Sequence, residues 1–384
     1  MFRPLPSDTA RGGEAPRVEF PGVNLLKTLA VLAVVYSHIS FYLIDDLGTG
    51  WWGIDLVYDV LVDGAKLNQH LSFLGVAAFM MLTGMLITRS AIRQDARPFL
   101  IARGARLLPG FWVAILAAIV LVRLGINGMF SGQTGITNGE AVLSFFLGGF
   151  FLKPEVAVLG VTWTLAVQVT FYLYCVLARP LLRAAPIAMP TLGAAVCMLV
   201  IFYNLYVPQP YAVPFLSKIA ATLPCVFLGQ IIYLGWARLT GARGLILAML
   251  AQVMVVWIAT DYQVYWAGSR YLWTIVVVTA TVVLLARYDG RIARSRIVYW
   301  TATRSFAIYL LHTLVLYRVY ENTVGHLGRT GAVLAFVVVC ALVSEALYRC
   351  VEVPAGRWIT DRWIRRVPAA DGVSATPAHS ESHA

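Results

Sequence analysis

The residues best suited to chemistry in this sequence are a lysine, a histidine and an aspartate along its first apolar stretch. Lys27 and His38 are eleven residues apart, which is about three helical turns. In a helix they return to nearly the same face, about 16 Å apart along the axis. Asp45 follows seven residues after His38, close to the same stripe, with Asp46 beside it. The spacing predicts one helix that carries a cation, an imidazole and a carboxylate along one side.

His38 at such a position is suited to act as a general base. A neutral imidazole takes a proton from a hydroxyl group near physiological pH, and Asp45 or Asp46 could orient the ring if the helix continues that far. The other interpretation is a histidine that only satisfies polar groups of neighbouring helices. The spacing does not decide between the two.

A second group of candidates is the segment 89–106, where five arginines stand against the single acid Asp95. Arg103 and Arg106 are three residues apart, so they share a helix face, and Pro109 follows. Guanidinium groups match the geometry of phosphate oxygens, which predicts a site for a phosphorylated cofactor that enters from the cytoplasm. Basic charge that serves only to orient the chain in a membrane explains the segment equally well.

The elements that position these residues must lie in a bilayer. The chain has 384 residues, of which 59% are hydrophobic and only 13% charged. A membrane-spanning helix needs about 20 mostly apolar residues. Apolar runs predict an all-α integral membrane protein with about ten such helices, at Asn24–Leu43, Leu71–Thr88, Leu107–Leu124, Thr162–Leu177, Thr191–Val207, Phe215–Trp236, Leu245–Thr260, Tyr271–Ala286, Thr301–Tyr320 and Gly331–Leu347. The shorter run Ala141–Leu152 predicts an interfacial or re-entrant helix.

Charge sets the expected orientation and domains. Most of the 30 Lys and Arg residues fall in alternate connecting segments, which places both termini in the cytoplasm. We expect an N-terminal arm over 1–22, a membrane domain over 23–366 and a disordered tail over 367–384. The net charge of +11 is spread over many membrane-edge segments, so anionic lipid explains it better than nucleic acid. The five cysteines lack metal-ligand spacing, and no metal is expected.

Several separated stretches resemble the membrane acyltransferase-3 family of bacterial sugar and glycan O-acyltransferases. Its first-helix signature is an arginine followed, after ten residues, by a histidine. The similar stretches here run in the family's order, from about Val23 to Pro354. They are Leu26–His38 (LKTLAVLAVVYSH), Thr83–Ile87 (TGMLI), Arg103 and Arg106 with Pro109, Trp163–Gln168 (WTLAVQ) with Phe171–Leu173, Ser305–His312 (SFAIYLLH), and Glu352 with Pro354.

The resemblance implies that an acyl donor, usually acetyl-CoA, binds from the cytoplasm and that its acyl group passes to a hydroxyl on the outer face. It implies His38 as the base, with Lys27 along the donor path. Asp45 stays the predicted orienting carboxylate on the ground of its spacing from His38. The expected donor-binding residues are Arg89, Arg103, Arg106 and Lys27, and the expected substrate-binding residues are Trp163, Gln168, Tyr172 and His312.

Two departures from the family pattern matter. Lys27 stands where the family has arginine, so it keeps the charge but loses the two-pronged hydrogen bond. Gln168 stands where the family usually has glutamate, so it can form hydrogen bonds but is not expected to accept a proton. His312 is either a substrate contact or a structural polar contact between helices. Glu345 and Glu352 on the last predicted helix face the same choice, and Glu352 lies near the inner membrane edge, where pairing with an arginine would satisfy it. The roles of both stay open.

These observations predict a multi-pass enzyme of the bacterial plasma membrane that transfers an acyl group from acyl-CoA. No serine or cysteine is well placed beside His38, so we expect direct transfer rather than an acyl-enzyme. The acceptor is expected to be a sugar-containing envelope molecule, such as a glycolipid like trehalose monomycolate. The alternative from another class is a permease or flippase for a glycan or lipid-linked substrate, which would leave acyl-CoA intact.

Overall fold

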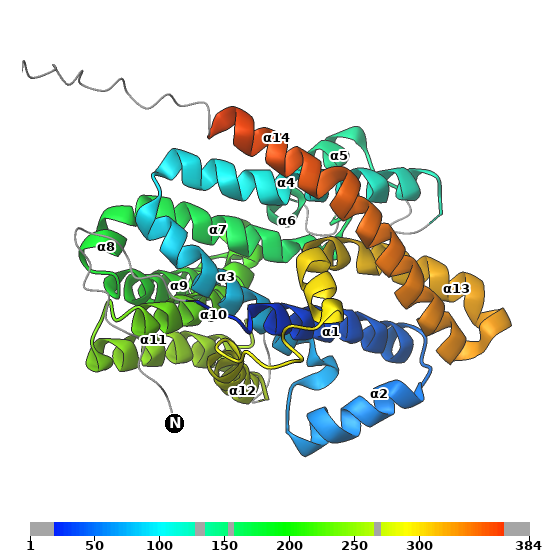
Figure 1. Ribbon diagram of the computed structural model, residues 1–384, viewed down its shortest axis with the longest axis horizontal. Helices are drawn as coiled ribbons and strands as arrows, with labels where there is room; N and C mark the ends of the chain where they lie inside the picture. The colour runs from blue at the N-terminus through cyan, green and yellow to red at the C-terminus, as the bar shows by residue number, and fades with distance from the viewer. Residues whose placement is uncertain (1–18, 127–134, 153–156, 265–269, 365–384) are drawn as a thin grey trace, which may run out of the picture.

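The computed structural model describes residues 19–126, 135–152, 157–264 and 270–364, and all regular elements within these ranges are helices. The long helices lie side by side (Figure 1). The predicted arm over 1–22 lies mostly outside the described residues, and the predicted tail over 367–384 lies entirely outside them. The α-helices are α1 Val23–Phe41, α2 Trp52–Val57, α3 Ser72–Arg93, α4 Ala96–Arg123, α5 Asn138–Phe145, α6 Gly149–Leu152, α7 Trp163–Leu177, α8 Arg179–Ala184, α9 Ala188–Tyr206, α10 Pro214–Trp236, α11 Ala242–Asp261, α12 Arg270–Leu285, α13 Arg296–Leu347 and α14 Val353–Trp363.

Eight helical stretches of the described chain are long and apolar enough to cross a membrane. The all-α membrane architecture is therefore confirmed, whereas the predicted number of ten differs from this count for two reasons. First, α12 has only 16 residues. Second, the last two predicted helices lie in one continuous element, α13, of 52 residues. Within the described chain, each of the ten apolar runs falls on a helix, although some helices are longer than the runs. The helix α4 begins at Ala96, well before the predicted start at Leu107, and α3 continues to Arg93, past the predicted end at Thr88.

The element α13 folds back on itself. Arg304 forms an ion pair with Glu345, which is 41 residues later. In a straight helix these residues would be about 60 Å apart, so the chain must reverse between them. Gly328 has non-helical angles, with φ at 66°, a region that glycine adopts readily. Figure 1 shows the two halves of α13 running back from a turn at the right-hand side.

The apolar segment predicted as one short helix is two pieces in the structure. The first, α5, begins with a capping box in which Thr137 and Glu140 satisfy each other's backbone N–H groups. Leu147, with φ at 58°, then separates α5 from α6. Neither piece is long enough to span a bilayer, as expected from the length of the run.

The helix α1 and the first half of α13 run parallel and touch along their length. Thr28 Oγ1 donates to the Val298 carbonyl at 3.1 Å, and Tyr42 OH donates to Glu321 at 2.8 Å. The residue numbers of both partners rise from the first contact to the second, so the two helices run in the same direction. As a result, the stripe of α1 that carries Lys27 and His38 lies along α13.

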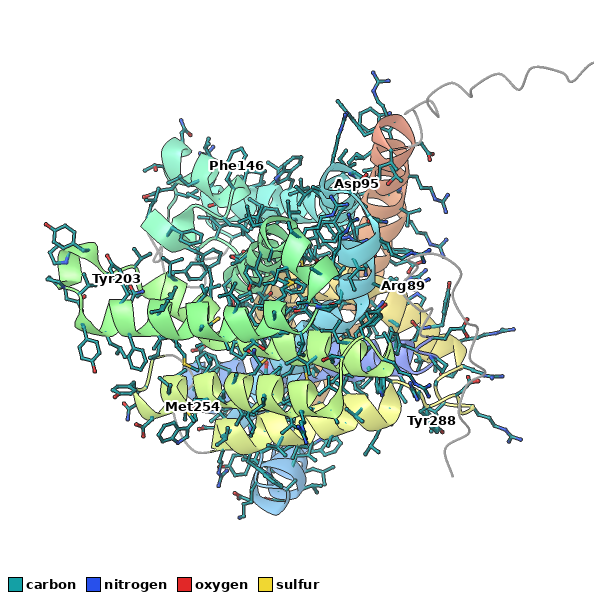
Figure 2. All side chains as sticks on the ribbon, turned by 90° about the vertical axis from the view of Figure 1, so that its left-hand side faces the viewer. Arg89, Asp95, Phe146, Tyr203, Met254 and Tyr288 are labelled. Atoms are coloured by element: carbon teal, nitrogen blue, oxygen red, sulfur yellow. The ribbon has the colours of Figure 1, made fainter. Side chains whose placement is uncertain are left out.

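Charged groups gather at one end of the bundle. Figure 2 shows Arg89, Asp95 and Tyr288 at one end of the long helices and Tyr203 at the other. Asp95 lies in the short connection between α3 and α4. The guanidinium of Arg179, from α8, donates to Asp95 and holds the pKa of that carboxyl below its usual value. This end contains the basic connections that the sequence predicts to be cytoplasmic.

Candidate active site

Two histidines from α1 and α13 meet inside the bundle. The Nδ1 atom of His38 lies 3.1 Å from the Nε2 atom of His312, and the ring centroids are 4.7 Å apart with the rings at 70°. Sequence reasoning left His312 as either a substrate contact or an interhelical polar contact. The structure gives it an interhelical contact, and the partner is the predicted base.

The hydrogen bonds around this pair determine where each neutral ring carries its proton. His312 Nδ1 lies 2.8 Å from the Tyr309 carbonyl and 3.1 Å from the Ile308 carbonyl. Carbonyl oxygens only accept, so Nδ1 of His312 is the donor and its Nε2 carries a lone pair. That lone pair can accept the Nδ1–H of His38, which also lies 3.0 Å from the Val34 carbonyl. The Nε2 atom of His38 is then unprotonated and available as a base.

The two rings differ in exposure. His312 is completely buried, with 0% of its surface exposed, whereas His38 is only partly buried. The arrangement therefore assigns them different capabilities. His38 can meet a substrate, and His312 can hold the His38 ring in one orientation and one protonation state.

Asp45 does not orient His38 in the structure. Its Oδ2 atom lies 3.2 Å from His70 Nε2, and His70 Nδ1 lies 2.7 Å from Ser40 Oγ. The reason is a change of helix type, because the chain passes from α1 into a π-helical turn over Tyr42–Asp46. A π-turn contains more residues per turn than an α-turn, so a spacing of seven no longer returns to the same face. These contacts attach the short helical turn Gln69–Leu71, which carries His70, to the end of α1.

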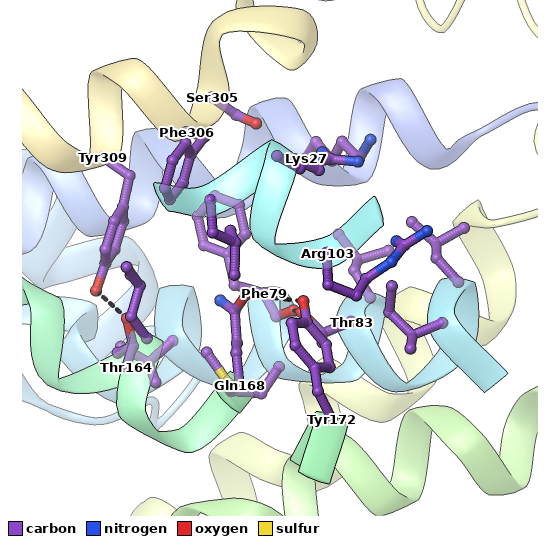
Figure 3. Close-up of a pocket in the computed structure, with 18 residues that line it drawn as sticks. Lys27, Phe79, Thr83, Arg103, Thr164, Gln168, Tyr172, Ser305, Phe306 and Tyr309 are labelled. Atoms are coloured by element: carbon purple, nitrogen blue, oxygen red, sulfur yellow. Dashed lines mark hydrogen bonds between the residues drawn. The ribbon is translucent and has the colours of Figure 1, made fainter. Parts of the chain in front are cut away.

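A cavity lies between α1, α3, α4, α7 and α13 and encloses about 860 Å³, including space open to solvent at its mouth (Figure 3). Five of the predicted site residues line it, and they come from three separate helices: Lys27, Arg103, Arg106, Gln168 and Tyr172. Figure 3 shows Lys27 and Arg103 toward one end and the Thr164–Tyr309 hydrogen bond at the other. We call this space the inner cavity.

The far end of the inner cavity lies close to the histidine pair. Tyr309 closes it, with its hydroxyl 2.7 Å from Thr164 Oγ1 and 2.7 Å from the Val161 carbonyl. The Tyr309 ring centroid is 5.9 Å from that of His312. The Phe79 ring stands 5.8 Å from the Tyr309 ring. Sequence reasoning did not single out Phe79, Thr164 or Tyr309, although Tyr309 lies within the SFAIYLLH stretch.

A second space, the vestibule, adjoins the inner cavity and shares Lys27, Arg106, Ser305 and Phe306 with it. It is more polar than the inner cavity. Its other polar lining residues are Asn24, Thr303, Tyr348, Glu352, Arg357 and Thr360. The two spaces therefore meet at the four side chains that they share.

Two of the predicted binding residues lie away from both the cavities and the histidine pair. Arg89 and Trp163 line neither the inner cavity nor the vestibule. Trp163 instead carries the Lys218 ammonium over its ring, with Nζ 4.2 Å from the centroid. The geometry therefore gives no support to a donor contact by Arg89 or a substrate contact by Trp163. In the part of the chain that the structure describes, no group of three or more potential metal-binding side chains occurs.

Helices long enough to cross a membrane enclose a cavity with cations at one end and a histidine pair beyond the other, which defines a multi-pass membrane protein with an internal site. Comparison with known proteins gives the class of enzyme. Residues 20–348 match the family described as an acyltransferase domain, Acyl_transf_3, and the chain belongs to this family. The predicted resemblance and the predicted enzyme class, an O-acyltransferase, are confirmed.

Relatives of the chain include a nodulation protein and two peptidoglycan O-acetyltransferases, one of them putative. Nodulation protein 10 of Rhizobium leguminosarum bv. viciae is 26% identical over 385 positions, covering 90% of this chain and 96% of that protein. The putative peptidoglycan O-acetyltransferase YrhL of Bacillus subtilis strain 168 is 26% identical, and the peptidoglycan O-acetyltransferase OatA of Listeria monocytogenes is 24% identical. The alignments cover 87% of this chain but only 54% and 55% of these two proteins, so the chain spans about half their length. No solved structure matches the chain.

Proposed function

We propose that this acyltransferase moves an acyl group, most simply acetyl, from acyl-CoA on the cytoplasmic side to a hydroxyl of a sugar-containing acceptor on the outer side of a bacterial plasma membrane. The proposal includes ten crossings within a membrane domain over 23–366 and cytoplasmic termini. A cell-envelope glycolipid, with trehalose monomycolate as one example, is the preferred acceptor class. The single observation that carries the proposal is an inner cavity with cations at one end and the histidine pair close to the other.

The cationic end supports a phosphorylated donor. Lys27, Arg103 and Arg106 line the inner cavity, and none of its lining residues is acidic. Cations inside a membrane domain are costly, and three of them face the single carboxylate Glu352 of the adjoining vestibule, so an anionic ligand would stabilise them. Arginine side chains bind phosphate oxygens with two parallel hydrogen bonds, and CoA carries several phosphate groups.

The distance along α1 supports delivery of a thioester toward His38. Lys27 and His38 are separated by about 16 Å along the helix axis, a length comparable to an extended phosphopantetheine arm. The inner cavity has apolar walls between its two ends, formed by residues such as Met80, Leu86 and Phe306. A donor whose phosphates bind near Lys27 would therefore direct its acyl end toward the histidine pair.

The proposed reaction is a direct transfer. His38 Nε2 takes the proton of the acceptor hydroxyl as the oxygen attacks the thioester carbon, which forms a C–O bond and a tetrahedral intermediate. The C–S bond then breaks, and the leaving thiolate takes the proton back from the imidazolium as CoA thiol. When His38 is an imidazolium, its Nδ1–H still donates to His312 Nε2. This hydrogen bond therefore holds the His38 ring through both steps.

The proposed function is tested with acetyl-CoA labelled in its acetyl group and membranes that contain the protein. We expect the label to move to a membrane lipid or glycan with release of free CoA. Intact acetyl-CoA would contradict the proposal and favour the permease alternative. Mass spectrometry of envelope lipids and glycans from a strain that lacks the protein would then identify the acceptor through a missing acetyl mass.

Replacing Arg106 by alanine should raise the KM for acyl-CoA and leave kcat nearly unchanged. A hydrogen bond to a charged group contributes about 1.5–3 kcal/mol, so the KM should rise by roughly ten-fold to a hundred-fold. Steady-state rates at varied acyl-CoA concentration measure this. Arg97→Ala is the matched control, because Arg97 is exposed on the same helix and lines neither cavity. Equal KM values for both variants would argue against a phosphate contact at Arg106.

Replacing His312 by alanine should lower kcat by roughly ten-fold to a hundred-fold, because the His38 Nδ1–H loses a buried acceptor worth about 1–3 kcal/mol. His312→Gln should retain more activity, since an amide oxygen can accept the same hydrogen bond. The KM for acyl-CoA should change little in both variants. Identical kcat values for the alanine and glutamine variants would show that the acceptor role is not what matters at this position.

A further inference from the structure

The end of α1 carries an exposed aromatic side chain on the same side as the proposed base. Phe41 is 40% exposed. It follows His38 by three residues, and side chains at that spacing are neighbours on a helix, with Cβ atoms about 5–6 Å apart. Leu32 is 55% exposed and precedes Phe41 by nine residues, which at about 100° per residue places it on the opposite side of the helix. The exposure of Phe41 is therefore on the side of His38 and not on that of Leu32.

A carboxylate is held next to this ring. Asp45 Oδ2 lies 3.2 Å from Nε2 of His70, and the His70 ring lies 6.1 Å from the Phe41 ring at 77°. The other ring nitrogen of His70 lies 2.7 Å from Ser40 Oγ, so the imidazole is held from both sides. Ser40 and His70 are buried, whereas the Asp45 side chain is 37% exposed. These contacts therefore fix a carboxylate that can still accept hydrogen bonds from a ligand.

The backbone around this carboxylate is unusual in two places. His70 and Leu71 have φ angles of 55° and 56°, in the left-handed region that residues other than glycine seldom adopt. Such residues persist only where surrounding contacts hold them, and they cluster at binding and active sites. Asp45 itself lies in the π-helical turn Tyr42–Asp46, and π-turns are also frequent at functional sites. Both distortions meet at the same exposed carboxylate.

An exposed aromatic ring beside an oriented carboxylate favours a carbohydrate ligand. The C–H groups of a sugar ring pack on an aromatic ring, and its hydroxyls donate hydrogen bonds that a carboxylate accepts. A phosphate or carboxylate group would be repelled by Asp45 and by Asp46, which is also exposed. Because Phe41 and His38 are neighbours on α1, a sugar that lies on Phe41 can bring a hydroxyl to the base.

We infer that Phe41 and Asp45 form the subsite for the acceptor sugar. The sugar ring packs on Phe41, Asp45 accepts hydrogen bonds from two of its hydroxyls, and the hydroxyl that receives the acyl group points to His38. His70 acts on the sugar only through Asp45, so it is a positioning residue. The inference rests on the proposed function and deepens it, because it assigns the residues that recognise the acceptor and gives Asp45 a binding role in place of the predicted orienting role.

The natural acceptor can be titrated before it is identified. Purified full-length protein is reconstituted in phosphatidylcholine with increasing fractions of an envelope extract from its own source, and labelled acetyl transfer from saturating acetyl-CoA is measured. Phe41→Ala and Asp45→Asn should each raise the half-saturating fraction of extract about tenfold, the effect of one packed ring or one hydrogen bond to a charged group. The KM for acetyl-CoA should not change. Asp45→Asn keeps an oxygen that can face His70, so the local fold is retained.

His70→Ala tests the positioning role. It should raise the half-saturating fraction of extract in the wild-type background but add little to Asp45→Asn, because the carboxylate on which it acts is already absent.

The controls are Phe146→Ala, which removes an exposed ring from the end of α5, and Asp59→Asn, which removes an exposed carboxylate after α2. Both should leave the half-saturating fraction unchanged. Wild-type values in Phe41→Ala or Asp45→Asn, or an equal rise in the KM for acetyl-CoA, would overturn the inference while the proposed function stands. No transfer by the wild type at any fraction of extract would remove the proposed function, and this inference with it.

Discussion

Replacing His38 by alanine should lower kcat for acyl transfer by about 10²–10⁴-fold, the usual contribution of a general base. This variant loses the base, because Nε2 of His38 is the unprotonated nitrogen of the pair that can meet a substrate. The unprotonated Nε2 of His312 already accepts a hydrogen bond from His38, and His312 is completely buried. The KM for acyl-CoA should change little, since His38 lines neither the inner cavity nor the vestibule. Release of CoA thiol, followed in membranes with matched protein levels, measures both constants.

His326→Ala is the matched control for this prediction. His326 is an exposed histidine beside the turn of α13 at Gly328, so its loss should leave kcat within the error of the wild type. A His38→Ala protein that inserts normally and retains wild-type kcat would remove His38 from the chemistry. A variant that keeps kcat but loses affinity for acyl-CoA would instead make His38 a binding residue.

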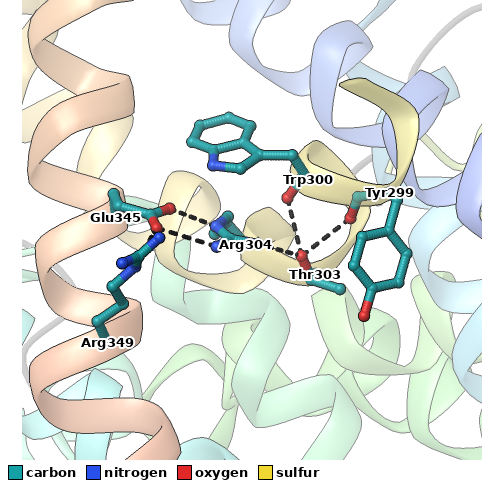
Figure 4. Close-up of polar contacts among 6 residues, drawn as sticks. All are labelled: Tyr299, Trp300, Thr303, Arg304, Glu345 and Arg349. Atoms are coloured by element: carbon teal, nitrogen blue, oxygen red, sulfur yellow. Dashed lines mark hydrogen bonds and ion pairs between the residues drawn. The ribbon is translucent and has the colours of Figure 1, made fainter. Parts of the chain in front are cut away.

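Replacing Glu345 by alanine should destabilise the protein by about 3–5 kcal/mol, because it leaves a buried arginine without its counter-charge. Arg304 donates to both oxygens of Glu345 (Figure 4). Its guanidinium also lies 4.6 Å from the Tyr348 ring and 5.3 Å from the Trp300 ring. The Arg304 side chain is only 11% exposed. This contact joins the two halves of α13, so its loss should also loosen the wall of the vestibule that Tyr348 forms.

Arg349→Ala provides the control for Glu345→Ala. Arg349 also donates to Glu345, but its side chain is 71% exposed, so its loss should cost no more than about 1 kcal/mol. Thermal unfolding of the proteins in the same detergent measures the difference. A paired change to apolar residues, Arg304→Met with Glu345→Leu, should recover most of the lost stability, because no buried charge is left alone. Equal stability of Glu345→Ala and Arg349→Ala would contradict this account.

Much of the helical content follows from sequence because each apolar run must satisfy its own backbone hydrogen bonds in a bilayer. The periodicity of α1 also places Lys27 and His38 on one stripe, and the structure lays that stripe along α13. The prediction for Asp45 fails at the π-helical turn, since no residue in the stretch YLIDD marks a change from α to π geometry. The sequence predicted two separate helices where the structure has the single element α13, which turns back at Gly328.

Contacts between distant helices could not be derived from the sequence alone. The pairing of His38 with His312 depends on the parallel contact of α1 with α13, and spacing within one helix carries no information about the partner helix. The same holds for Glu345 and Glu352, where sequence offered both carboxylates the same choice and the fold gives Arg304 to the first. Tyr309 and Phe79 escaped notice because aromatic residues in apolar runs are usually packing residues.

The central claim is that a donor bound at the basic end of the bundle reacts with an acceptor on the opposite side through His38. Sealed inverted vesicles, with the cytoplasmic face outward, test it most directly when acetyl-labelled acetyl-CoA is added outside. The account predicts that wild-type vesicles place label on an acceptor facing the interior, and that His38→Ala vesicles do so at least about a hundred times more slowly. Labelling at equal rates in both, or only in right-side-out vesicles, would contradict it.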